Sequence, residues 1–207
     1  VAEIAKEMGI LTIGVVTKPF MFEGKARKLR ADYGTQKLRE NVDDLIVILN
    51  DKLLKNTDTK ITLNSAFSLA DEVLEQGITG ITDLLTTIGE VNIDFADIAT
   101  TVKYRGKAYM GVGMAEGERK VEEAVLQAIS NPLTEAKING AKGVIFNVKG
   151  NESLSLLEIN SAIGIINDKI SEDANVIFGT VIDKNMSDKV GVTIIATGVE
   201  ENTEVKV

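Results

Sequence analysis

The sequence contains no cysteine, no histidine and no tryptophan, and only 4% of its residues are aromatic. Without cysteine there is neither a disulfide framework nor a thiolate site. The absence of both cysteine and histidine removes the ligands of structural zinc sites and excludes serine–histidine and cysteine–histidine catalysis. Any acid–base chemistry must therefore use carboxylates, lysine, tyrosine or a bound cofactor.

Acidic residues outnumber basic ones, and long apolar runs are scarce. The formal net charge is −8 over 207 residues, whereas a general nucleic-acid-binding protein needs a basic surface that replaces counterions. No apolar run approaches the roughly 18 residues of a membrane helix. We therefore expect neither a nucleic-acid partner nor insertion into a membrane.

The first residues are typical of the end of an amphipathic helix capped by Gly9, not of a signal peptide. Because no methionine precedes this helix, we interpret the sequence as a fragment, a cleaved product or an engineered truncation.

The first third of the chain alternates between apolar and charged stretches. Residues 11–16 and 45–49 are continuous apolar runs, typical of parallel strands buried on both faces. The charged stretch between them, from Glu23 to about Arg39, favours a helix. This order predicts part of a doubly wound, Rossmann-like sheet.

A long periodic segment follows, from about Thr62 to Thr87. Its apolar residues recur at three- and four-residue steps and predict one helix with a broad apolar face. Gly77 and Gly80 each weaken such a helix by about 1 kcal/mol relative to alanine, so we expect both to pack closely against a neighbour. We expect the helix to end at Gly89.

The remainder predicts strands at residues 108–114, 143–148, 176–182 and 190–197 and helices at 118–130 and 154–170. We expect a four-stranded sheet with helices on one face. The glycines between Gly111 and Gly117 do not fit the dinucleotide-binding fingerprint, since the third comes one place late. We interpret this segment as a tight turn from strand to helix.

The predicted fold is thus α/β. It comprises the C-terminal part of a Rossmann-like domain at 1–60, a central helix and loop at 61–97, a second α/β domain with the four-stranded sheet at 98–200, and a tail at 201–207.

Three carboxamide and carboxylate residues follow the long helix: Asn92, Asp94 and Asp97. Such a group could orient and polarise a water molecule, although carboxylates do this poorly unless the site is desolvated or the electrophile is activated. The alternative is that they cap helices, a position that asparagine and aspartate favour.

Further candidates lie just past the two predicted strands. Glu23 and Arg27 are four residues apart, and Asn50 directly follows the second strand. Ligands of open α/β sheets bind at the carboxyl ends of the strands, where these residues lie. The alternatives are that Glu23 and Arg27 form an ordinary surface ion pair and that Asn50 is a turn residue. Phe67 and Asp71 on the long helix could stack on a base and hydrogen-bond its edge, or form a core ring beside a solvated carboxylate.

No Gly-x-x-x-x-Gly-Lys-Ser/Thr loop occurs in the sequence. We therefore find no segment able to cradle a triphosphate through backbone amides.

Taken in order, several short motifs resemble the FtsZ family, the tubulin-like GTPases of cell division. They are LTIGVVTKPF at 11–20, FEG at 22–24 with Arg27, ND at 50–51, AF at 66–67 with AD at 70–71, NIDFAD at 92–97, MGVG at 110–113 and IATG at 195–198. The resemblance runs from the first residue to about Thr197, and NIDFAD is its most specific motif. Leu49 departs from the family, which usually has proline there.

The resemblance implies GTP or GDP as ligand, with Mg²⁺ bound through the nucleotide and no metal site of the protein's own. Glu23 and Arg27 would contact the sugar, and Asn50, Phe67 and Asp71 would form the guanine pocket. The segment carrying Asn92, Asp94 and Asp97 would insert into the GTP site of the next subunit in a filament and position the attacking water.

The resemblance also implies where such a protein acts and what it meets. We expect other subunits of the same protein and cell-division proteins as partners, in the cytoplasm at mid-cell. The family's phosphate-binding N-terminal half would lie upstream of Val1, and the tail that recruits membrane anchors is absent, so we expect the isolated chain to be inactive.

Two other hypotheses remain open. The chain could be a non-catalytic interaction module that caps FtsZ filaments. It could also be a small-molecule-binding regulatory domain, for which the sequence offers no ligand pocket.

Overall fold

The computed structural model describes residues 1–55, 61–86, 94–102, 108–130, 133–134 and 136–199. Its helices are α1 (Ala2–Glu7), α2 (Lys25–Arg39), α3 (Asn50–Lys55), α4 (Leu63–Thr86), α5 (Phe95–Val102), α6 (Lys120–Ser130) and α7 (Leu156–Asn167). Its strands are β1 (Ile13–Lys18), β2 (Asp44–Leu49), β3 (Tyr109–Glu116), β4 (Gly143–Gly150), β5 (Asn175–Ile182) and β6 (Lys189–Thr197), with 3₁₀ turns η1 (Met21–Glu23) and η2 (Lys184–Met186). The predicted α/β class is confirmed.

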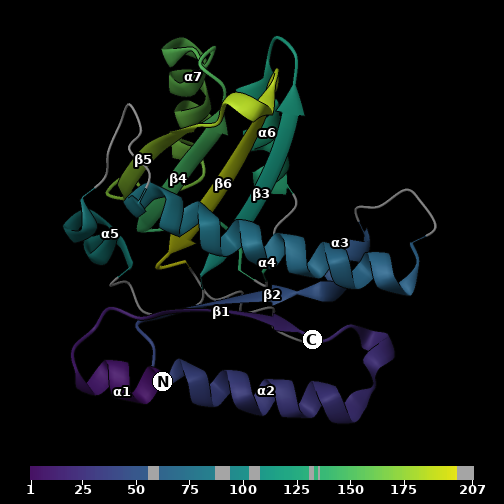
Figure 1. Cartoon of the computed structure of the whole chain (residues 1–207). Coiled ribbons are helices and arrows are strands. Elements are labelled where there is room, and N and C mark those ends of the chain that lie inside the picture. The colour runs from purple at the N-terminus through teal and green to yellow at the C-terminus, as the bar shows by residue number, and fades with distance from the viewer. Residues whose placement is uncertain (56–60, 87–93, 103–107, 131–132, 135, 200–207) are drawn as a thin grey trace, which may run out of the picture.

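The smaller sheet consists of β1 and β2, which pair in parallel (Figure 1). Helix α2 packs on one face of this sheet and α4 on the other. Helix α1 ends before Gly9, whose φ is 68°. Burial on both faces holds for most of β2, but every residue of β1 is only half-buried. The reason is that β1 has no second strand neighbour among the described residues.

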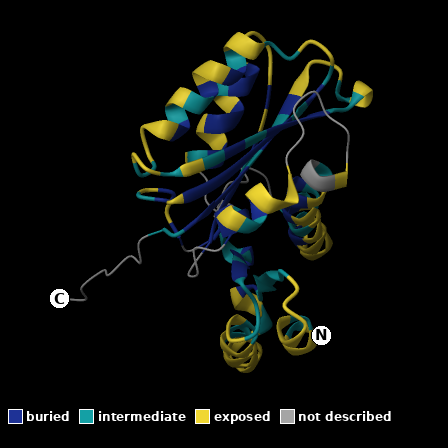
Figure 2. Ribbon diagram, turned by 90° about the vertical axis from the view of Figure 1, so that its left-hand side faces the viewer, coloured by how far each residue is buried: buried dark blue, intermediate teal, exposed yellow. Residues whose placement is uncertain are grey.

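The larger sheet has the strand order β3-β6-β4-β5, in which β6 is antiparallel to both neighbours and β4 is parallel to β5. Helices α6 and α7 cover one face, as predicted. The other face packs against α4 and α5, which the sequence pattern did not indicate. Figure 2 shows that buried residues concentrate in these strands, whereas exposed residues lie on the outer faces of the helices.

Helix α4 joins the two sheets through one apolar core. Ala70, Val73 and Ile81 of α4 belong to the same buried cluster as Ile46 of β2 and Ile195 of β6. Apolar burial of this kind is the main term holding such layers together.

The two glycines of α4 pack closely, as predicted. A Cβ atom at Gly77 would lie 2.8 Å from Met110 Cε, and one at Gly80 would lie 2.8 Å from Thr193 Cγ2. The helix therefore sits against β3 and β6 at a distance that larger residues would prevent.

The predicted turn between Gly111 and Gly117 is wrong for most of its length. Strand β3 continues to Glu116, and only Gly117, with a φ of 101°, forms the turn into α6. Gly111 and Gly113 lie inside the strand because α6 crosses it closely: a Cβ atom at Gly113 would lie 1.9 Å from the carbonyl oxygen of Ala124.

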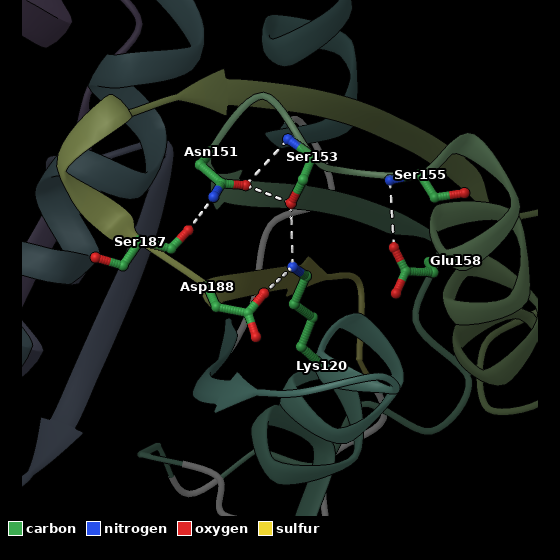
Figure 3. A network of polar contacts seen from close by, with 7 residues as sticks. All are labelled: Lys120, Asn151, Ser153, Ser155, Glu158, Ser187 and Asp188. Atoms are coloured by element: carbon green, nitrogen blue, oxygen red, sulfur yellow. Dashed lines mark hydrogen bonds and ion pairs between the residues drawn. The ribbon is translucent and has the colours of Figure 1, made fainter.

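The loops at the far end of the larger sheet are joined by polar contacts (Figure 3). Lys120 Nζ donates to Asp188 Oδ1 at 2.6 Å and to Ser153 Oγ at 3.2 Å. Asn151 accepts from the Ser153 amide at 3.0 Å and donates to the Ser187 carbonyl. Because Lys120 is buried, these partners keep its charge compensated.

Replacing Gly113 with alanine should lower the free energy of unfolding by at least about 2 kcal/mol, since the backbone of α6 cannot yield to the new methyl group. Gly164→Ala is the matched control, because no atom lies within 4 Å of a Cβ there. It should leave stability unchanged or raise it by up to about 1 kcal/mol. Urea unfolding of both variants measures the difference, and equal midpoints would contradict the packing.

Asp44, at the start of β2, is a buried carboxylate. Burial raises its pKa to about 7 from 3.8, against the lowering effects of the Leu45 amide and Arg39. The folded protein therefore binds the proton of the Asp44 carboxyl group more tightly than the unfolded chain does. The stability that this proton binding contributes is fully present below about pH 4 and is lost as the pH rises to about 7.

The variant Asp44→Asn should remove that pH dependence. Between pH 4 and pH 8 the unfolding free energy of the variant should rise relative to the unaltered chain by up to about 4 kcal/mol. Urea unfolding of both proteins across this range measures the effect. Parallel pH profiles would show that Asp44 does not carry it.

Candidate functional site

A cavity of about 470 Å³ opens between the carboxyl end of the smaller sheet and α4, within the size range of small-molecule sites. All five residues predicted to contact a nucleotide line this cavity: Glu23, Arg27, Asn50, Phe67 and Asp71. They come from η1, α2, α3 and α4, so the fold brings together side chains that are distant in sequence. Their binding role stays a prediction.

Glu23 and Arg27 form one wall. Glu23 Oε2 pairs with Arg27 Nη1 at 2.9 Å, and Glu23 Oε1 accepts from the Phe20 amide at 2.9 Å. The Glu23 side chain is only 9% exposed, whereas that of Arg27 is 70% exposed, so the pair joins a largely buried carboxylate to a guanidinium at the surface. It fixes the turn that leads from β1 into α2.

Asn50 and Asp71 supply acceptors on the opposite side. Asn50 is not a turn residue but the first residue of α3. Its Oδ1 is buried and has no hydrogen-bond partner among the described residues, a state that costs about 1–3 kcal/mol unless water or a ligand donates to it. The Asp71 carboxylate is exposed and, within the described ranges, has no ion pair or hydrogen bond.

Phe67 presents an aromatic ring at the cavity. It is 39% exposed, so it is not a core ring. Its centroid lies 5.6 Å from that of Phe20 and 6.0 Å from that of Phe22, both edge-to-face. These contacts restrain the ring and leave part of it open to a planar partner.

The predicted catalytic segment is partly helical. Asn92 lies outside the described residues. Asp94 caps α5: its Oδ1 accepts from the Ala96 amide at 3.3 Å, and its carbonyl accepts from the Asp97 amide at 3.1 Å. Asp97 therefore lies in the first turn of α5 and not in a loop. The capping alternative is correct for Asp94, and both carboxylates remain exposed.

The residues of α4 that line the cavity lie in the first half of this helix, and α5 lies near its opposite end (Figure 1). From Asp71 to the end of α4 at Thr86 the helix rises about 22 Å, at 1.5 Å per residue, and α5 lies beyond that end. The carboxylates of Asp94 and Asp97 therefore cannot reach a molecule bound in the cavity of their own chain.

The sequence assigned no role to two residues of the cavity region, although one of them, Asp51, belongs to the ND motif at 50–51. Arg30 lines the cavity one helical turn after Arg27, a spacing that could have indicated it. Asp51 hydrogen-bonds the Met21 amide at 2.9 Å, a contact between residues 30 positions apart that no local pattern predicts.

Among the described residues, no group of three or more histidine, cysteine, aspartate or glutamate side chains is placed to hold a metal ion. None of the described helices combines the length and the apolar character needed to cross a membrane.

Two family models match the chain. Residues 1–58 match the GTPase domain of the tubulin/FtsZ family, and residues 106–200 match the C-terminal domain of the FtsZ family.

Solved structures agree with these matches. An empty FtsZ dimer from M. jannaschii is 38% identical, with a TM-score of 0.90 over 95% of this chain and 57% of that chain. A tryptophan-to-tyrosine mutant of M. jannaschii FtsZ is also 38% identical, with a TM-score of 0.91 over 96% and 59%. The chain therefore spans less than two thirds of the length of these relatives.

A more distant structure, GDP-bound CetZ1 from Haloferax volcanii, is 20% identical, with a TM-score of 0.76 over 99% of this chain and 61% of that chain. At this identity the likeness concerns the fold alone.

Removing the cap of α5 should be measurable separately from any catalytic effect. Asp94→Ala should lower the unfolding free energy by about 1 kcal/mol, whereas Asp94→Asn should retain most of the cap. Urea unfolding of the two variants measures this. Equal stability of Asp94→Ala and the unaltered chain would contradict the capping geometry.

Proposed function

The chain belongs to the tubulin/FtsZ family, and on that premise we propose that it is part of an FtsZ-type cell-division GTPase that polymerises head to tail. In this proposal the chain supplies the guanosine side of the nucleotide pocket and one polymer face. Asn92, Asp94 and Asp97 hydrolyse nothing in their own subunit. They position water at the GTP held by the next one.

The observation that carries the proposal is the separation of the two polar sites along α4. A binding site and a carboxylate group at opposite ends of one rigid helix can meet only between two copies of the chain. When one copy follows another head to tail, the contact is heterologous, and it generates a filament where the rotation between copies does not close into a ring.

The cavity chemistry suits guanine. The N1–H and N2–H₂ groups of guanine are adjacent donors, and the free Asp71 carboxylate is an acceptor for both. Adenine presents an unprotonated N1 at that place, which would face the carboxylate as a second acceptor. A site built on such polar contacts rejects the wrong partner strongly because its own groups are then left unpaired.

The unpaired Asn50 Oδ1 can take a further base N–H, and the restrained ring of Phe67 can stack on the base. The Glu23–Arg27 pair offers an acceptor and donors for ribose hydroxyls. Mg²⁺ would be held chiefly by the phosphates and water, since it rarely uses an all-protein cage.

Hydrolysis of a γ-phosphate depends on positioning and electrostatics more than on a strong base. Exposed carboxylates at the start of α5 meet that need when a neighbour presents an activated phosphate. This role does not require histidine, which the chain lacks.

The test is reconstitution. Mixing the chain with an N-terminal fragment of the same protein should restore GTP turnover, and Asp97→Ala should lower it at least about 100-fold. Glu123→Ala, which removes an exposed carboxylate from α6, is the control and should turn over GTP normally. An Asp97→Ala mixture as fast as the unaltered one would contradict the proposed role.

A second function is favoured by the exposure of the α5 face. The chain alone would act as a non-catalytic module that binds the end of a filament and stops its growth. Light scattering of an intact, polymerising subunit with and without the chain tests this. Reduced scattering at stoichiometric amounts supports capping, and unchanged scattering contradicts it.

A further inference from the structure

We propose that Asp51 is a positioning residue that fixes the sugar-binding side of the cavity relative to its base-binding side. Recognition of the ribose would then depend on Asp51, although Asp51 touches no ligand. This inference rests on the proposed nucleotide pocket.

Asp51 links two elements that carry different parts of the site. It follows Asn50 in α3, and its Oδ1 accepts from the amide of Met21, the first residue of η1, at 2.9 Å. The preceding amide, that of Phe20, donates to Glu23 Oε1 at 2.9 Å. Two carboxylates thus hold two consecutive amides at the turn after β1.

The turn has few other anchors. Phe20 is buried, but Met21 is 82% and Phe22 54% exposed. Gly24, with a φ of 93°, ends the turn in a conformation that only glycine adopts readily. Among the described residues, the hydrogen bond from the Met21 amide to Asp51 ties η1 directly to α3.

The base side does not depend on this contact in the same way. Asn50 is held at the junction of β2 and α3, and Phe67 and Asp71 belong to α4. The Phe67 ring also contacts Phe20 and Phe22 of the turn, but Phe20 is itself anchored in the buried core. The neighbours Ala66 and Ala70 pack α4 into the core. Loss of the Asp51 contact should therefore displace Glu23 and Arg27 while Asn50, Phe67 and Asp71 stay in place.

The contact can be removed from either end. Asp51→Ala deletes the acceptor. Met21→Pro deletes the donor, and proline suits this position because it opens a 3₁₀ turn after an extended residue: Phe20 has a φ of −60° and a ψ of 152°. Asp51→Asn keeps an acceptor oxygen without the charge, so it separates positioning from an electrostatic effect.

The experiment measures binding of guanosine, 2′,3′-dideoxyguanosine and adenosine to the chain by calorimetry. The unaltered chain should prefer guanosine to both analogues. Asp51→Ala and Met21→Pro should each weaken guanosine binding about ten-fold and abolish the preference for the intact ribose. Both should keep the preference for guanosine over adenosine, and combining them should add nothing.

Asp51→Asn should bind guanosine within about two-fold of the unaltered chain, since a neutral oxygen still accepts the hydrogen bond. Asp183→Ala is the matched control, because Asp183 also accepts from a backbone amide, that of Asn185 at 3.0 Å, but lies away from this cavity. It should leave all three affinities unchanged.

Several results would overturn the role of Asp51. They are full ribose discrimination in Asp51→Ala, an Asp51→Asn variant as weak as Asp51→Ala, or an equal loss of base and ribose selectivity. The failure of the proposed pocket is distinct: the unaltered chain would then bind guanosine no better than adenosine. Absence of guanosine binding both by the unaltered chain and by its mixture with the N-terminal fragment would contradict both proposals.

Discussion

The packing of α4 between two sheets is the constraint on which the rest of the molecule depends. One face of this helix contacts the smaller sheet and another contacts the larger sheet, and a single apolar cluster includes residues from all three. Gly77 and Gly80 allow the approach, because a Cβ atom at either would press on Met110 or Thr193. The position of α4 thereby sets the position of both polar sites.

Because of this arrangement, the length of α4 separates the two polar sites of the chain. Phe67 and Asp71 near its start line the cavity, whereas α5 follows its end. A rigid helix cannot bring its two ends together. A chemistry that needs both sites must therefore join two molecules, and under the proposed function this requirement would make hydrolysis depend on assembly.

Much of the fold could be predicted from the sequence because long elements carry strong periodicity. Helix α4 and the strands of the larger sheet follow directly from apolar spacing. The short helices α3 and α5 were missed, since six and eight residues offer too little pattern. Gly111 and Gly113 were misplaced because their cause is the close crossing of α6, a tertiary contact.

The candidate site, like the fold, has parts that the sequence could predict and parts that it could not. Residue type, order and family resemblance selected five side chains that the fold gathers at one cavity. They did not indicate Asp51, because its partner Met21 lies on another element and the hydrogen bond exists only after β1 and β2 have paired. Helix capping was offered for Asp94 as the alternative to catalysis, and the structure shows that Asp94 caps α5, whose first turn contains Asp97.

The most direct test of the central claim is complementation between two inactive variants, each reconstituted with the N-terminal fragment. Asp71→Ala disables the pocket, and Asp97→Ala disables the carboxylate. If the carboxylate acts on a neighbour's nucleotide, an equal mixture should recover about one quarter of the normal GTP turnover, because random head-to-tail mixing makes one contact in four productive. A mixture as inactive as either variant alone would contradict the account.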